Sequence, residues 1–148
     1  MNWKVLLLGP KGTPYRGGIF TVSIRFPQAY PQEAPEIRFV TTIYHLMVNS
    51  KCFGGIVPGD VQLNKLYLIN SLDCWPHEHK IEEILKCIFS LFYKQDYRFY
   101  YLDQIYNEYW SMPAVFDAKI RYFTKKYANP LRLVKIYSRT MDWDFNFP

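Results

Sequence analysis

The side chains suited to covalent chemistry are three cysteines and three histidines: Cys52, Cys74, Cys87, His45, His77 and His79. A cysteine thiolate is a strong nucleophile, so Cys52 is a candidate for that role. Cys87 lies in a run with helical spacing of apolar residues, where we expect a buried, inert thiol. An odd number of cysteines without a Cys-x-x-Cys pair favours a reducing, intracellular compartment, cytoplasm or nucleus.

The pair His77 and His79 has a spacing that permits metal ligation. A zinc site, however, needs three or four ligands, and the sequence supplies no clear third one beside these two. We therefore expect a solvated loop and no metal site. No motif in the chain indicates a cofactor.

The elements that position these residues begin with strands. The sequence predicts a hairpin of two strands. The first is a short apolar run over Trp3–Leu8, the second is an alternating run over Ile19–Phe26, and a loop rich in Gly and Pro joins them. Pro31 and Pro35 hold the following chain extended and remove backbone donors. Ile37–Tyr44, rich in β-branched and aromatic residues, reads as a third strand. An antiparallel meander is the simplest way to join the three.

The later chain is predicted to be helical. A central helix across the sheet follows from apolar residues on one stripe, namely Ile81, Ile84, Leu85, Ile88, Leu91 and Phe92. A short helix is expected over Leu102–Trp110, and another begins near Pro113 and continues to Ala128. Strands followed by helices predict the α+β class.

Composition is typical of one folded domain. The 148 residues are 49% hydrophobic and 19% aromatic, enough to build a core. No apolar stretch approaches the ~20 residues that a membrane helix needs. We therefore expect no membrane as a partner.

Two stretches resemble the ubiquitin-conjugating enzyme family. The first includes Gly9-Pro10, Thr13-Pro14-Tyr15, Gly17-Gly18, Phe26-Pro27, Tyr30-Pro31, Pro35 and Tyr44-His45; the second is Lys65–His77 with Trp75. His45, Trp75, Pro31 and Pro35 are the residues that mark the fold. The resemblance implies a core over residues 1–128, with an insertion at about 51–63 and a tail over 129–148 outside it. It also implies that the family's N-terminal helix is missing, because the chain begins at the first strand.

The same resemblance places unsuitable residues at two catalytic positions. Tyr67 stands eight residues before Trp75, where the family carries its acceptor cysteine. A phenol has a pKa near ~10, against ~8.5 for a thiol, and it forms no thioester. Met47 stands where the family has the asparagine that stabilises an oxyanion, a contribution of ~3 kcal/mol that a thioether cannot supply. Asn49 is the alternative donor, and His45 is expected to be structural.

Three hypotheses follow. The resemblance implies a ubiquitin-conjugating enzyme variant that binds or scaffolds without catalysis, with ubiquitin or a ubiquitin-like protein and an active conjugating enzyme as partners. The alternative is a divergent active enzyme that uses Cys52, or less plausibly Cys74; a surface loop rich in turn residues is the simpler explanation of the insertion that holds Cys52.

The third hypothesis is a basic, aromatic module for nucleic acid, based on the net charge of +5. Its cations are Arg121, Lys125, Lys126, Arg132, Lys135 and Arg139, interleaved with Tyr122, Tyr127 and Tyr137. A solvated charged face explains the same residues, so we do not expect nucleic acid as a partner.

Overall fold

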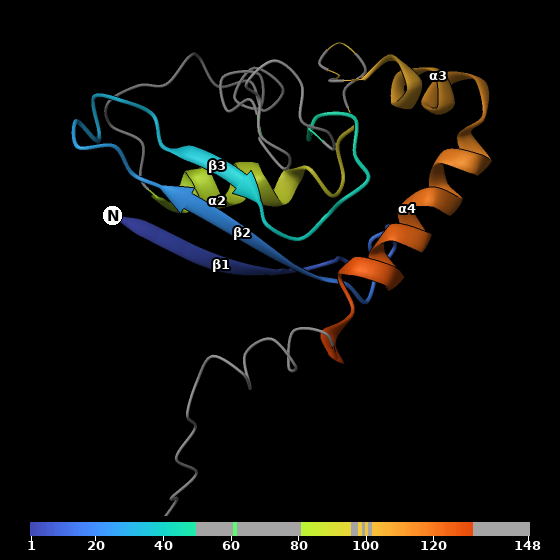
Figure 1. Cartoon of the computed structure of the whole chain (residues 1–148), viewed down its shortest axis with the longest axis horizontal. Helices are drawn as coiled ribbons and strands as arrows, with labels where there is room; N and C mark the ends of the chain where they lie inside the picture. Colours follow the sequence, from blue (N-terminus) through green and yellow to red (C-terminus); the bar gives the residue numbers. More distant parts are fainter. Residues whose placement is uncertain (50–60, 62–80, 96–97, 99, 101, 132–148) are drawn as a thin grey trace, which may run out of the picture.

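The computed structural model describes residues 1–49, 61, 81–95, 98, 100 and 102–131. Strands come first along the chain and helices follow (Figure 1). The strands are β1 (Asn2–Leu8), β2 (Ile19–Arg25) and β3 (Glu36–Phe39), and the helices are α2 (Ile81–Ser90), α3 (Asp103–Ser111) and α4 (Pro113–Tyr127). The predicted α+β class and the three expected helices are confirmed.

The three strands form one antiparallel sheet in the order β1, β2, β3. β1 pairs with β2 along its whole length, from Asn2 opposite Arg25 to Leu8 opposite Ile19. β3 pairs with the other edge of β2. The predicted antiparallel meander is therefore confirmed.

The loop between β1 and β2 is closed by backbone contacts that require glycine. The N–H of Gly9 donates to the carbonyl oxygen of Gly18 at 2.8 Å. A Cβ atom at Gly9 would lie only 1.8 Å from the carbonyl oxygen of Tyr15. The Tyr15 ring is buried, and its hydroxyl donates to the carbonyl oxygen of Tyr44 at 3.0 Å. The loop thus folds back onto the core.

The third strand is shorter than predicted, because it ends at Phe39 and not at Tyr44. The N–H groups of Val40 and Thr41 both donate to the carbonyl oxygen of Thr21, which ends the regular pairing. Tyr44 is nevertheless buried, as a loop residue. The prediction was wrong here because core burial and strand formation favour the same residue types.

The core lies between one face of the sheet and α2. The ring centroid of Phe92 is 5.1 Å from that of Phe20 and 6.4 Å from that of Phe39. Further buried residues of the sheet, of α2 and of the turn after it are Val22, Ile24, Ile37, Ile84, Cys87, Ile88 and Leu91. The central helix predicted from apolar spacing is confirmed. Burial raises the pKa of the Cys87 thiol, which disfavours the reactive thiolate.

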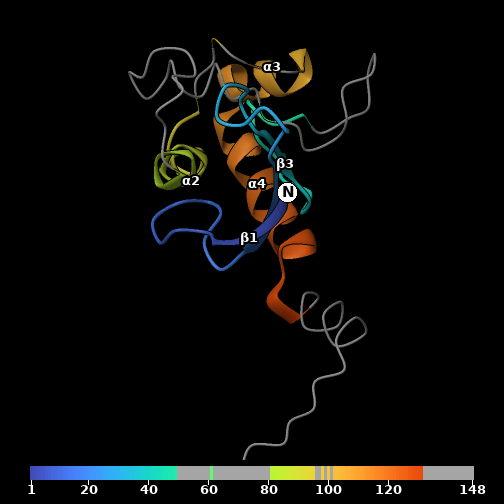
Figure 2. The same cartoon turned by 90° about the vertical axis from the view of Figure 1, so that its left-hand side faces the viewer.

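α3 and α4 follow one another at one side of the molecule, and α4 extends past the sheet (Figures 1 and 2). The end of α4 is tied to the sheet by a hydrogen bond of 2.8 Å from the Ile19 N–H to the Ala128 carbonyl oxygen. A Cβ atom at Gly18 would lie 2.7 Å from Cγ2 of Thr124, so only glycine allows this approach. None of the helices within the described ranges is long and apolar enough to span a membrane.

Candidate functional site

His45 lies in the loop after β3, and both of its ring nitrogens are engaged. Nδ1 accepts the backbone N–H of Met47 at 2.9 Å, so it carries no proton. Nε2 is then the protonated nitrogen, and it donates to the carbonyl oxygen of Leu91 at 2.8 Å, just beyond α2. The imidazole therefore joins the loop to the end of the central helix.

Burial determines the charge of this ring. His45 is fully buried, and burial lowers the pKa of His45 to about 4, although the hydrogen bond to Leu91 favours the proton. Near neutral pH the ring is uncharged and has no free nitrogen. This geometry supports a structural part for His45, because both ring nitrogens are hydrogen-bonded within the protein and neither faces a substrate as an acid or base.

Met47 is also part of the core, with 2% of its surface exposed. The Met47 side chain has no hydrogen-bond donor, and its backbone N–H already donates to Nδ1 of His45. Asn49, the alternative oxyanion donor, is 3% exposed. The side chains at both positions are therefore packed into the protein, where an incoming carbonyl oxygen would have to displace existing contacts.

Gln95 connects this loop to the β1–β2 loop. Its Oε1 accepts the N–H of Leu46 at 3.3 Å, and its Nε2 donates to the Tyr15 hydroxyl at 2.7 Å. That hydroxyl in turn donates to the carbonyl oxygen of Tyr44. The loop around His45 is thus fixed from two sides, by Leu91 and by this chain of hydrogen bonds.

A second polar network lies next to the same loop and was not predicted. The hydroxyl of Tyr44 donates to Oε2 of Glu108 at 2.5 Å, and Nζ of Lys119 lies 2.5 Å from Oε1. Gln104 Nε2 adds a hydrogen bond of 3.3 Å to Oε1. These contacts join the loop to α3 and α4. They border a hollow of about 380 Å³ beside Phe123.

Glu108 is ionised despite its burial. Only 6% of its surface is exposed, and burial opposes its charge, but the hydrogen bonds from Lys119, Tyr44 and Gln104 prevail and lower its pKa. Burial, together with the hydrogen bond to Glu108 and its charge, raises the pKa of Tyr44. The sequence carried little signal for this network, because Lys119 and Tyr44 lie 11 and 64 positions from Glu108.

Val61 is the one residue of the proposed insertion that the structure describes. It forms an antiparallel bridge with Val48, and its N–H donates to the carbonyl oxygen of Ile37 at 3.1 Å. Its side chain is 8% exposed and belongs to the hydrophobic core. Position 61 therefore lies against β3 and the His45 loop, although the sequence assigned it to a surface loop.

Several predicted site residues lie outside the described part of the chain: Tyr67, Cys52, Cys74, Trp75, His77 and His79. Of the candidates in the described part of the chain, His45 and Met47 are in contact, and Asn49 is buried two residues further on. Pro31 follows a cis peptide bond after Tyr30, whose ring packs 4.9 Å from that of Phe26. Pro35 precedes β3. Within the described ranges, no group of three His, Cys, Asp or Glu side chains is placed to hold a metal.

Comparison with known proteins agrees with this fold. The family model described as "Ubiquitin-conjugating enzyme" matches residues 1–124. A relative from Arabidopsis thaliana, named "Probable ubiquitin-conjugating enzyme E2 31", is 32% identical over 128 residues, which cover 86% of this chain and 75% of the relative.

A crystal structure from Plasmodium yoelii, of a protein assigned to the ubiquitin-conjugating enzymes, superposes with a TM-score of 0.72 at 29% identity. It covers 86% of this chain, and 76% of that protein is matched. The family match spans the strands, the His45 loop and most of α4. The chain therefore belongs to the ubiquitin-conjugating enzyme family.

Proposed function

We propose that this chain is a non-catalytic member of its family, which acts as a binding or scaffold subunit in the conjugation of ubiquitin or a ubiquitin-like protein. The observation that carries the proposal is the packing of the His45 loop. The position that resembles the oxyanion asparagine holds Met47, a buried side chain without a donor. His45 is neutral and fully engaged beside it.

The nucleophile position supports the same conclusion through the resemblance. Tyr67 takes the place of the acceptor cysteine, and a phenol does not form a thioester. Loss of the oxyanion donor alone costs such a reaction about 10²–10³ in rate. The two changes together remove both the group that receives the cargo and the group that assists its transfer.

A binding subunit needs an accessible surface, and the outer face of β1 offers one. Leu7 and Val5 pack toward the core, so Leu6 and Leu8 point to the opposite face. Leu6 is 52% exposed and Leu8 67%. Exposed apolar side chains gathered on one face are typical of protein interaction sites, which suits a protein partner such as ubiquitin or an active conjugating enzyme.

The alternative is a divergent active enzyme that uses Cys52. The position of Val61 supports this alternative. Val61 is nine positions after Cys52 in the sequence, and it pairs with Val48 of the His45 loop. The relatives are themselves named as conjugating enzymes. Cys87 is not a candidate, because it is buried and its pKa is raised.

A charging assay separates the two. The chain is incubated with activating enzyme, ATP and either ubiquitin or a ubiquitin-like protein, and adducts are resolved on gels with and without reductant. An active conjugating enzyme serves as positive control, and Cys52→Ala and Cys74→Ala are run in parallel. We expect no reductant-sensitive adduct. An adduct that disappears in Cys52→Ala establishes the alternative and refutes the non-catalytic subunit.

A pull-down then tests the binding role. We expect the full chain to capture ubiquitin, a ubiquitin-like protein or an active conjugating enzyme, and Leu6→Arg with Leu8→Arg to abolish that capture. Leu131→Arg, the same change at an exposed leucine beyond the end of α4, is the matched control. Capture that survives the paired leucine substitutions excludes the outer face of β1 as the binding surface.

A further inference from the structure

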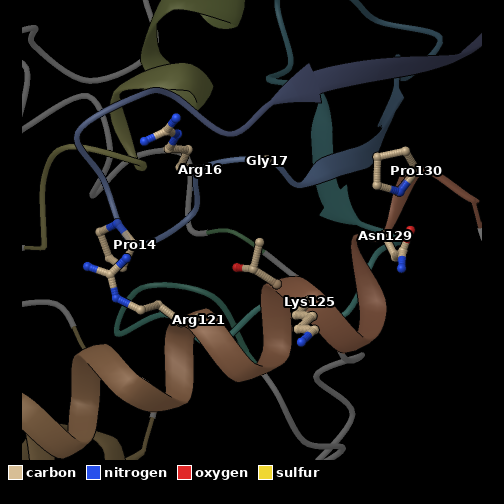
Figure 3. A pocket seen from close by; sticks show the side chains of 8 residues that line it. Pro14, Arg16, Gly17, Arg121, Lys125, Asn129 and Pro130 are labelled. Carbon is tan, nitrogen blue, oxygen red and sulfur yellow. The ribbon is translucent and has the colours of Figure 1, made fainter.

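A second hollow lies away from the His45 loop, between the β1–β2 loop and the end of α4 (Figure 3). It has a volume of about 400 Å³. Its charged and amide-bearing wall residues are Arg16 on the loop, Arg121 and Lys125 on α4, and Asn129 just beyond that helix. We call it the basic pocket. None of the described residues that line it is acidic.

The backbone around the basic pocket is fixed. The Ile19 N–H bonds to the Ala128 carbonyl oxygen at 2.8 Å, directly beside the pocket. Gly18 approaches Thr124 so closely that no Cβ atom fits between them. Loop and helix therefore keep their separation without any ligand, and the cations stand on a preformed frame.

The donors around the pocket are available to a ligand. Arg16, Arg121 and Lys125 are exposed, and Figure 3 shows Arg121 extending from α4 toward Pro14 on the loop. Among the described residues, the acidic group that pairs with one of these cations is Asp117, 4.0 Å from Arg121, and both side chains are more than half exposed. Such a surface pair is too weak to neutralise the pocket.

Asn129 adds a directed donor. Its Oδ1 accepts the N–H of Leu131 at 2.9 Å. The amide nitrogen of this wall residue carries two N–H donors from which a phosphate can accept. Gly17 forms another part of the wall with φ of 81°, and a Cβ atom there would meet nothing within 4 Å. The wall at Gly17 is therefore open.

We infer that the basic pocket binds a phosphorylated serine or threonine side chain of a partner protein. Two guanidinium groups, an ammonium group and an amide provide the donors that a phosphate monoester accepts, and clustered arginines are the usual means of recognising such groups. The inference does not depend on whether the chain is catalytic. It means that a partner protein has to be phosphorylated before the basic pocket can bind it.

A nucleic acid fits the observations less well. Its binding depends on a series of cations that follow many phosphates, whereas the basic pocket gathers three cations around one hollow. The next cation on α4, Lys126, donates to the Tyr122 hydroxyl at 3.2 Å and lies over the rings of Tyr122 and Tyr127. It is therefore not part of the pocket.

The experiment measures binding of the full chain to fluorescent degenerate peptide libraries with a fixed phosphoserine or phosphothreonine, by anisotropy. The same libraries without phosphate, and single-stranded and double-stranded oligonucleotides, are the comparison probes. We expect the phosphorylated libraries to bind at least about tenfold more tightly than the unphosphorylated ones, as charge-assisted hydrogen bonds would provide. Equal binding of the two kinds of library, or tighter binding of the oligonucleotides, overturns the inference.

Variants locate the site. Arg121→Gln and Arg16→Gln are expected to weaken phosphopeptide binding by about tenfold each. Asn129→Asp keeps the oxygen that Leu131 needs but replaces the donors with negative charge, and should abolish binding. Lys126→Gln, with the same charge change as Arg121→Gln on the same helix, is the control and should change affinity by less than about twofold. Thermal unfolding verifies that each variant folds, and a loss in Lys126→Gln equal to that in Arg121→Gln refutes the site.

Discussion

The buried, neutral state of His45 predicts a distinctive dependence of stability on pH. In the unfolded chain the imidazole takes up a proton as the pH falls through about 6.5, whereas in the folded protein its pKa is about 4. Between these values only the unfolded state binds the proton, so acid favours unfolding. The contribution of His45 to stability is fully present above about pH 6.5 and is lost as the pH falls toward 4.

The size of the effect follows from the two pKa values. A pKa that falls from 6.5 to about 4 corresponds to about 3 kcal/mol of unfolding free energy. Most globular domains have a stability of only about 5–15 kcal/mol, so this loss is easily measured. Below about pH 4 the folded protein also accepts the proton, and the His45 contribution stops changing.

Urea unfolding between pH 4 and 8, with His45→Gln as the reference, isolates this contribution. The variant cannot titrate at position 45, and the remaining acidic groups and histidines cancel in the difference between the two proteins. We expect the wild-type advantage to be largest above pH 7 and to shrink by about 3 kcal/mol at pH 4. A difference that stays constant across this range refutes the burial of a neutral imidazole.

Three further predictions test the packing around the Glu108 network and between the β1–β2 loop and α4. Tyr44→Phe leaves Oε2 of Glu108 without its donor and should cost about 2 kcal/mol in urea unfolding, the scale of a hydrogen bond to a charged group; a cost below about 0.5 kcal/mol contradicts the network. Glu108→Gln should be less stable than wild type at pH 7. This deficit should shrink as the pH falls below about 4.5 and through the lowered pKa of Glu108, because the stabilising carboxylate is then protonated. A deficit that does not depend on pH argues against an ionised Glu108. Gly18→Ala should lower stability by about 1–3 kcal/mol because of the 2.7 Å contact with Thr124, and Thr124→Ser in the same chain should recover part of that loss, whereas strictly additive effects would show that Thr124 is not the obstacle.

Local signals in the sequence were sufficient for most of the fold. Apolar residues at helical spacing located α2, and Pro113 marked the first turn of α4. The loop rich in Gly and Pro located the first hairpin. Each of these features depends on neighbours within a few positions, which a single sequence records directly.

Features that depend on contacts between distant residues could not be predicted from local patterns in the sequence. The end of β3 is set by two bonds to Thr21, which no local pattern announces. Val61 joined the core although glycines and prolines nearby indicated a loop. In both cases the deciding partner lies well over ten residues away, so spacing rules could not identify it.

The candidate site shows the same limits. The sequence singled out His45 and Met47, and the structure describes both, but Glu108 reads in sequence as an ordinary polar position on a short helix. The sequence also grouped Lys126 with Arg121 and Lys125 as one basic face. The structure separates Lys126 from that group and adds Arg16 from the first loop. Charged side chains interact only when the fold places them close together, and the sequence does not show which distant elements will meet.

The bond between Ile19 and Ala128 also has a consequence for synthesis of the protein. The first residue of β2 leaves the ribosome more than a hundred residues before the carbonyl group that receives its N–H. During that interval the early hairpin exists without the helix that later covers its end. Completion of the fold must therefore wait until translation has passed α4, and a nascent chain halted before that point would present an uncovered sheet end to chaperones.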